Sequence, residues 1–133
     1  MPETKAKIMR NFYGIDGDKI GRVVEAHLIK NEVNALTQFS ANVTSALKKI
    51  RNKIVQDGGT VIFCAGDSVL FQGSFDDSWC TKILDLFLKT TGCTASMGVG
   101  DTLTESYLAL KLAKANGGGE FIHYAQMTER NHG

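Results

Sequence analysis

The strongest pattern in the sequence is a stripe of six apolar residues with the period of an α-helix. Successive members lie three or four residues apart, so all of them project from one side of a helix. They are Leu36, Phe39, Val43, Leu47, Ile50 and Ile54. The pattern stops at Asp57-Gly58-Gly59, where glycine suits a helix end. This helix is predicted to pack its apolar side against the rest of the fold.

Strand patterns occur on both sides of this helix. Two runs rich in β-branched and aromatic residues, 60–65 and 68–72, are separated only by Gly66-Asp67, which is typical of a β-hairpin. Further strands are predicted at 9–16, 94–99 and 120–124, and further helices at 20–28, 79–90 and 103–113. The order β-α-α-β-β-α-β-α-β predicts one α+β domain over residues 1–133, of the ferredoxin-like, split-βαβ type with an extra edge strand.

Composition excludes several classes of function. Fifteen basic against fourteen acidic residues give a net charge near +1, which disfavours binding of duplex nucleic acid through bulk charge. No apolar run approaches the ~18–20 residues of a membrane span, and the N-terminus lacks the apolar core of a signal peptide. No membrane insertion and a cytoplasmic location are therefore expected. The cysteines Cys64, Cys80 and Cys93 form no CxxC pair and are predicted to be reduced.

Two aspartates at predicted strand ends are the best candidates for chemistry. Asp16 ends the first strand, and Asp67 lies in the hairpin turn. Because the first strand of a split-βαβ sheet lies beside the hairpin, both carboxylates are expected at one sheet edge. Paired carboxylates suit Mg²⁺ or Mn²⁺ that bridges triphosphate oxygens. Neighbouring glycines would also let a ligand approach the backbone.

Simpler explanations of these motifs stay open at this level. Gly66-Asp67 is also an ordinary turn, and Asp16-Gly17-Asp18 an ordinary loop. Lys114 suits the C-terminus of a helix without any ligand. The Gly-Val-Gly of 98–100 fits close helix packing better than a dinucleotide-binding loop. The histidines have no metal-ligand spacing, and Trp79 and the phenylalanines are assigned to the core.

Four segments taken together resemble a known family. They are FYGIDGDKIG (12–21), VIFCAGDSVLF (61–71), TASMGVG (94–100) and SYLALKLAKANGGG (106–119). In this order they resemble the nucleotide-polymerising palm shared by GGDEF diguanylate cyclases and the large polymerase subunit of type III CRISPR complexes. Because the chain is palm and little else, it is similar to the stand-alone minimal CRISPR polymerases (mCpol) over about residues 8–125.

The resemblance implies a role for individual residues. Asp16 corresponds to the first metal ligand of the family, the backbone carbonyl of Gly17 is expected to be a neighbouring metal ligand, and Asp67 takes the second ligand position. Lys114 matches the lysine of an ALxxAKxxG pattern, which contacts triphosphate. The residues expected to bind nucleotide or phosphate are Gly17, Asp18, Lys19, Ile20, Gly66, Ser68 and Lys114.

The sequence also departs from the family pattern. Ala65 replaces the first glycine of the GGDD or GGDEF turn, and Ser68 replaces its acidic fourth residue. Gly118 stands where cyclases often place an arginine, and the asparagine and aspartate that read guanine have no clear match. The loss of one acid weakens the expectation of two full-strength metal sites.

The resemblance implies nucleotidyl transfer with two Mg²⁺ or Mn²⁺ ions, in which a ribose hydroxyl attacks an α-phosphate and pyrophosphate leaves. The expected product is a cyclic di- or oligonucleotide of the cyclic di-AMP type, made from ATP in antiphage defence. A homodimer is expected, with a separate membrane-bound effector as the target of the product. Two alternatives remain: a catalytically degenerate palm that binds nucleotide as a sensor, and a ferredoxin-like interaction module.

Overall fold

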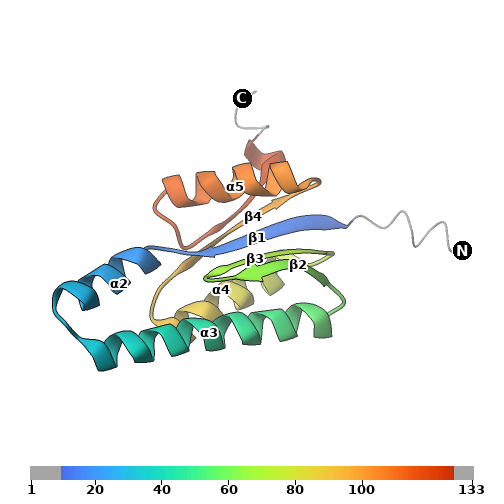
Figure 1. Cartoon of the computed structure of the whole chain (residues 1–133). Helices are drawn as coiled ribbons and strands as arrows, with labels where there is room; N and C mark the ends of the chain where they lie inside the picture. The colour runs from blue at the N-terminus through green and yellow to red at the C-terminus, as the bar shows by residue number, and fades with distance from the viewer. Residues whose placement is uncertain (1–9, 128–133) are drawn as a thin grey trace, which may run out of the picture.

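Within the part of the chain that the structure describes, the first strand lies at the centre of a five-stranded sheet (Figure 1). The computed structural model describes residues 10–127. Its elements are β1 (Asn11–Gly17), α2 (Ile20–Ile29), α3 (Val33–Gln56), β2 (Thr60–Ala65), β3 (Ser68–Gly73), α4 (Asp77–Thr91), β4 (Ala95–Gly100), α5 (Leu103–Ala115) and β5 (Phe121–His123). The strand order is β2-β3-β1-β4-β5. β1 is antiparallel to β3 and β4, and β5 is parallel to β4, which confirms the predicted split-βαβ fold with an extra edge strand.

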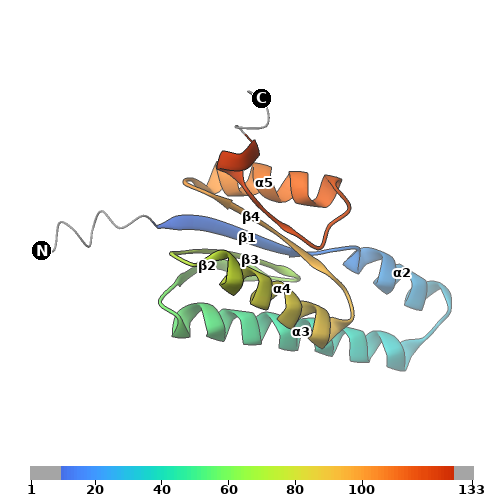
Figure 2. The same cartoon turned by 180° about the vertical axis from the view of Figure 1, so that it is seen from behind.

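Helices cover the two faces of this sheet unequally (Figures 1 and 2). α3 and α4 pack side by side on one face, whereas α5 contacts β1, β4 and β5 on the other. The predicted apolar stripe of α3 faces the sheet, and all its members from Phe39 onward are buried. The largest side chains of the core are Tyr13, Phe71, Phe87, Ile15 and Ile50.

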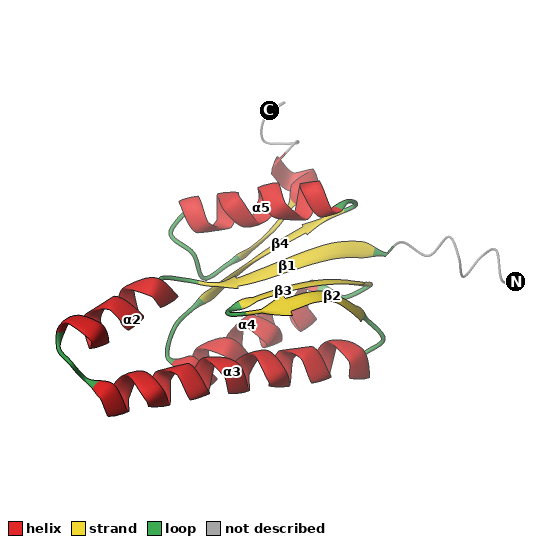
Figure 3. Cartoon of the chain, viewed as in Figure 1, coloured by secondary structure: helices red, strands yellow, loops and turns green. Residues whose placement is uncertain are grey.

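α2 lies beyond the end of the sheet at which β1 stops (Figure 3). It begins three residues after β1 and contains no buried residue, although Ile20, Val23 and Val24 pack partly against the core. This placement sets the N-terminus of α2 beside the C-terminal end of β1. None of the helices within residues 10–127 has both the length and the apolar composition needed to cross a bilayer.

A phenylalanine of β2 lies on the surface and not in the core, contrary to the prediction from sequence. Phe63 is 52% exposed and its neighbour Ile62 is 45% exposed. The pairing of β2 with β3 shifts register between Val61 and Phe63, and such a bulge breaks the alternation of inward and outward side chains. Both apolar residues therefore lie on the surface of this edge strand.

The glycines of β4 bring it into close contact with α5. A Cβ atom at Gly98 would lie 2.1 Å from the Ser106 carbonyl oxygen and 2.3 Å from the Leu110 nitrogen. A Cβ atom at Gly100 would lie 2.8 Å from the Ser106 nitrogen. The glycines therefore serve close packing, as the sequence indicated, and they fix the position of α5 over the sheet.

We expect Gly98→Ala to destabilise the protein by about 1–3 kcal/mol, since the new methyl group would force the β4 and α5 backbones apart. Gly21→Ala is the control, because a Cβ atom there meets no atom within 4 Å and alanine favours helix. Chemical denaturation monitored by circular dichroism measures both. Equal midpoints for Gly98→Ala and the wild type would contradict the packing role.

Candidate functional site

Asp16 and Asp67 meet at the C-terminal end of β1. Asp16 pairs with Ser68, the first residue after the hairpin turn, and the Gly17 N–H donates to the Asp67 carbonyl oxygen at 3.1 Å. A Cβ atom at Gly17 would lie 3.0 Å from Asp67 Oδ2, so the Asp67 carboxylate lies against the glycine backbone. Strand pairing thus brings together two acids that are far apart in the sequence.

The ammonium group of Lys114 lies at the same place. Its Nζ is 3.0 Å from Asp16 Oδ2, 2.8 Å from the Gly17 carbonyl oxygen and 3.1 Å from Asp18 Oδ1. Burial by itself lowers the pKa of Lys114, but hydrogen bonds to Asp16 and Asp18 outweigh it and raise the pKa above its ordinary value. Lys114 is therefore charged, and it offsets part of the negative charge of the nearby carboxylates. We call Asp16, Gly17, Asp67 and Lys114 the β1 cluster.

Asp18 has a different environment from the other two acids. Its side chain is 6% exposed and accepts hydrogen bonds from the hydroxyls of Thr94 and Ser96 and from the Gly119 N–H, each at 2.8 Å. Burial raises the pKa of Asp18, but these bonds and the one from Lys114 lower it below its ordinary value. Its own N–H donates to the Thr94 carbonyl oxygen at 2.8 Å. Phosphate binding by Asp18 stays a prediction, and its carboxylate and N–H already have partners within the protein.

The N-terminus of α2 offers backbone donors next to the β1 cluster. Lys19, the N-cap residue, has a φ of 58°, in the left-handed region that few residues other than glycine adopt. The first N–H groups of a helix have no acceptor within it. A left-handed residue followed by a helical one also forms a concave nest of N–H groups that suits an anion. Lys19 and Ile20, both predicted to bind phosphate, occupy these two positions.

A hollow of about 250 Å³ opens between α2, α3 and the hairpin turn. Gly66 and Asp67 form its edge on the side of the β1 cluster. Its remaining walls are mostly apolar with two hydroxyl groups, and they are formed by Ile20, Val24, Phe39, Ser40, Val43 and Thr44. An apolar slot with a few hydroxyl groups can hold a flat heterocyclic ring and hydrogen-bond to its edge.

The oxygen atoms of the β1 cluster fit a hard divalent cation. Burial raises the pKa of Asp67, and the nearby Asp16 charge raises it further, so a cation is attracted there. Mg²⁺ is commonly held by one or two carboxylates together with substrate phosphates. Within residues 10–127, no group of three or more His, Cys, Asp and Glu side chains is arranged to hold a metal. A cation at Asp16, Asp67 and the Gly17 carbonyl would therefore need further ligands from a substrate or from water.

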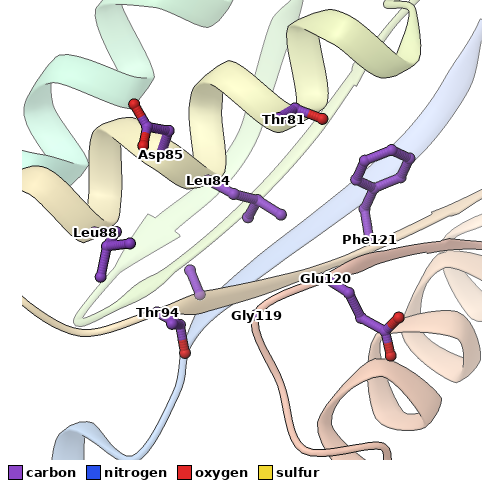
Figure 4. Close-up of a pocket in the computed structure, with 9 residues that line it drawn as sticks. Thr81, Leu84, Asp85, Leu88, Thr94, Gly119, Glu120 and Phe121 are labelled. Atoms are coloured by element: carbon purple, nitrogen blue, oxygen red, sulfur yellow. The ribbon is translucent and has the colours of Figure 1, made fainter.

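A second hollow, of about 360 Å³, lies between α4 and the β4–β5 side of the sheet (Figure 4). Leu84 and Leu88 of α4 and Phe121 of β5 make it mainly apolar. Thr94 and Gly119 also line this hollow, and both residues donate hydrogen bonds to the Asp18 carboxylate. None of the residues predicted to bind metal or phosphate lines this hollow, so it is separate from the β1 cluster.

The remaining predicted residues lie in the hairpin turn. Gly66 has a φ of +61°, which suits the first position of a tight turn. The hydroxyl of Ser68 donates to Asp16 Oδ1 at 2.5 Å. The structure thus places Gly66 and Ser68 around Asp67, as the sequence indicated.

Sequence reasoning missed the partners of Asp18 and the lining of the α2–α3 hollow. Thr94 directly precedes β4, Ser96 is the second residue of that strand, and Gly119 lies in the turn after α5 with a φ of +75°. The run of small and hydroxyl residues in 94–100 was a signal for buried hydrogen bonding, but it did not indicate the acceptor. Ser40 and Thr44 on α3 carried no motif at all.

Solved structures with similar backbones define the class of fold. The GGDEF domain of DgcB from Caulobacter crescentus, in complex with c-di-GMP, matches with a TM-score of 0.59 at 11% identity, over 87% of this chain and 78% of that one. The active GGEEF domain of a diguanylate cyclase from Vibrio cholerae gives 0.58 at 12%, over 92% and 87%. The Csm1-Csm4 cassette in complex with pppApA gives 0.61 at 16%, over 84% of this chain but 20% of that one. The fold is the α+β palm of nucleotide cyclases and CRISPR polymerases.

Sequence comparison narrows this class to one family. The mCpol family, the minimal CRISPR polymerase domain, matches residues 12–124. The chain therefore belongs to the minimal CRISPR polymerase family, which confirms the resemblance found in its motifs. A comparison with curated proteins finds no match.

We predict that Asp67→Asn stabilises the metal-free protein at pH 7, by less than about 1 kcal/mol because solvent screens a half-exposed group. The raised pKa of Asp67 means that the folded state binds its proton more tightly than the unfolded state. Protonated Asp67 therefore contributes to stability below its unfolded-state pKa, and this contribution is lost as the pH rises through its folded-state pKa.

Thermal unfolding in a metal chelator measures this effect, with Asp101→Asn as an exposed control for the same loss of charge. The gain from Asp67→Asn should shrink at a pH where the wild-type Asp67 is protonated. A lower melting temperature for Asp67→Asn than for the control at pH 7 would contradict the electrostatic interpretation.

Proposed function

We propose that this protein is a metal-dependent nucleotidyltransferase that makes a cyclic di- or oligonucleotide from nucleoside triphosphate and releases pyrophosphate. The observation that carries the proposal is the meeting of Asp16, Asp67 and the Gly17 carbonyl with Lys114 at the end of β1. Membership of the mCpol family supports it independently.

In this proposal Asp16, Asp67 and the Gly17 carbonyl hold Mg²⁺ or Mn²⁺, two ions in all. When bound, such ions promote ionisation of the attacking hydroxyl and stabilise the charge that develops on the leaving pyrophosphate. The protein's own contribution is rigid placement. Pairing of β1 with β3 fixes the backbone on both sides of the hairpin turn, and the missing side chain at Gly17 leaves room for the Asp67 carboxylate.

The triphosphate would lie between the N-terminus of α2 and Lys114. The N–H groups of Lys19 and Ile20 supply donors at one side, and the Lys114 ammonium supplies charge at the other. The base would enter the hollow between α2 and α3, where Ser40 and Thr44 offer hydroxyl groups. ATP is the favoured substrate, since Csm1-Csm4 cassettes of similar fold were solved with pppApA and with cA4.

A palm that binds nucleotide without turnover is the second candidate. Ser68 stands at the position of a family acid, and its hydroxyl donates to Asp16 Oδ1. This position therefore offers a metal no negative charge. The third alternative, an interaction module of unrelated ancestry, is disfavoured because the family match spans residues 12–124.

The proposal includes a homodimer. A cyclic dinucleotide needs two phosphodiester bonds between opposed nucleotides, whereas one palm offers a single proposed pair of metal-binding acids, Asp16 and Asp67. Two copies related by a two-fold axis would place each hydroxyl at the other α-phosphate. Following the family resemblance, we further propose that the enzyme acts in the cytoplasm in antiphage defence, and that its product binds a separate, membrane-bound effector.

Incubation with each nucleoside triphosphate and Mg²⁺ or Mn²⁺, followed by mass spectrometry, should yield a cyclic product and pyrophosphate, with ATP the best substrate. Asp16→Asn and Asp67→Asn should each lower the rate by at least about 10²-fold, since each removes a charged ligand of the ions. Asp101→Asn, which loses the same charge on an exposed residue, should keep wild-type activity. Nucleotide binding without any product in the wild type would favour the degenerate palm instead.

If the active form is a homodimer, specific activity must depend on protein concentration. Specific activity should fall on dilution, and an excess of Asp67→Asn subunits should suppress the turnover of wild-type subunits, because mixed dimers contain only one intact set of ligands. Light scattering at the same concentrations reports the oligomeric state. Constant specific activity at concentrations where scattering shows only monomer would exclude the two-fold dimer as the active form.

A further inference from the structure

The three N–H donors of Lys114 are already used within the protein. A lysine ammonium has three donors and no acceptor. Three oxygen atoms lie within 3.1 Å of Nζ, one each from Asp16, Gly17 and Asp18. In this arrangement Lys114 has no donor left for a phosphate, so it must release at least one of these oxygens before it can contact a triphosphate.

Two of these three oxygens belong to the proposed metal ligands. Asp16 Oδ2 and the Gly17 carbonyl oxygen face the Lys114 ammonium at 3.0 and 2.8 Å. An ammonium group and a divalent cation repel each other, and here both would need the lone pairs of the same two oxygen atoms. Lys114 in this position therefore competes with any ion at Asp16 and Gly17.

The third oxygen belongs to a residue that is not among the proposed metal ligands. Asp18 is fixed by Thr94, Ser96 and Gly119. Asp18 can therefore remain a partner of Lys114 after the contacts with Asp16 and Gly17 are broken. The lysine can turn about this anchor without leaving the site.

We propose that Lys114 is an internal counter-cation that closes the metal site until a nucleoside triphosphate draws its ammonium away. The proposal rests on the proposed function, whose substrate and ions it couples. In the nucleotide-free protein Lys114 neutralises Asp16 and fills the Gly17 carbonyl, so a divalent ion binds weakly. A triphosphate offers Lys114 stronger negative charge, and the vacated oxygens then become available. Nucleotide and ion thus bind as a pair, each raising the affinity for the other by the same factor.

The test is Mn²⁺ binding without turnover, followed from the electron paramagnetic resonance signal of free Mn²⁺. We compare the wild type with Lys114→Gln, which removes the charge and keeps a polar side chain, and with Lys114→Met. Lys111→Gln is the matched control, because Lys111 is an exposed lysine of the same helix with the same charge. Without nucleotide, both Lys114 variants should bind Mn²⁺ at least about 10-fold more tightly than the wild type, within the usual range of coupling between sites.

A non-hydrolysable ATP analogue should strengthen Mn²⁺ binding by the wild type and by Lys111→Gln far more than by the Lys114 variants. Mn²⁺ alone should also raise the melting temperature of the Lys114 variants more than that of the wild type. Equal Mn²⁺ affinities for the wild type and both Lys114 variants without nucleotide would overturn the proposal, even if the enzyme makes product. If the Lys114 variants gain Mn²⁺ affinity but the wild type makes no product from any nucleoside triphosphate, the role of Lys114 stands and the proposed function is refuted.

Discussion

Mutual repulsion among three carboxylates at the end of β1 is the constraint on which the rest of the site depends. Asp16, Asp18 and Asp67 lie within one short stretch of strand and one turn. Lys114 forms ion pairs with Asp16 and Asp18, and hydroxyl and N–H donors stabilise the charge of Asp18. Among the residues that the structure describes, none forms an ion pair with Asp67, and burial and the nearby Asp16 charge raise the pKa of Asp67. The Asp67 carboxylate therefore leaves negative charge without an ion-pair partner in the β1 cluster, and a divalent ion bound there would stabilise this charge.

The fold supplies each part of this arrangement from a different element. The central position of β1 sets Asp16 between the hairpin and β4. The close approach of α5 to the glycines of β4 fixes the helix that carries Lys114. The position of α2 beyond the sheet leaves its first N–H groups next to the same strand end. The packing of α5 on β4 and the pairing of β1 thus determine whether Lys114 reaches the carboxylates of the β1 cluster.

The sequence predicted the elements that had a clear period and the contacts that followed from topology. The stripe of α3, the hairpin and the split-βαβ order were sufficient to place Asp16 beside Asp67. The exposure of Phe63 was not predictable, because a bulge in an edge strand leaves no mark in hydrophobicity. The burial of Asp18 was missed for a similar reason, since its donors come from residues 94–96 and 119, far along the chain. The left-handed Lys19 is likewise set by tertiary context, because its residue type does not favour that conformation.

The most direct test of the account is a crystal structure of the wild type with Mn²⁺ and a non-hydrolysable ATP analogue, with the ion located by its anomalous scattering. We expect an anomalous peak within coordination distance of the Asp16 carboxylate and the Gly17 carbonyl. We also expect the Lys114 ammonium to have turned to the phosphates while its contact with Asp18 is retained. A bound nucleotide with Lys114 still on Asp16 and Gly17, and with the ion elsewhere, would contradict it.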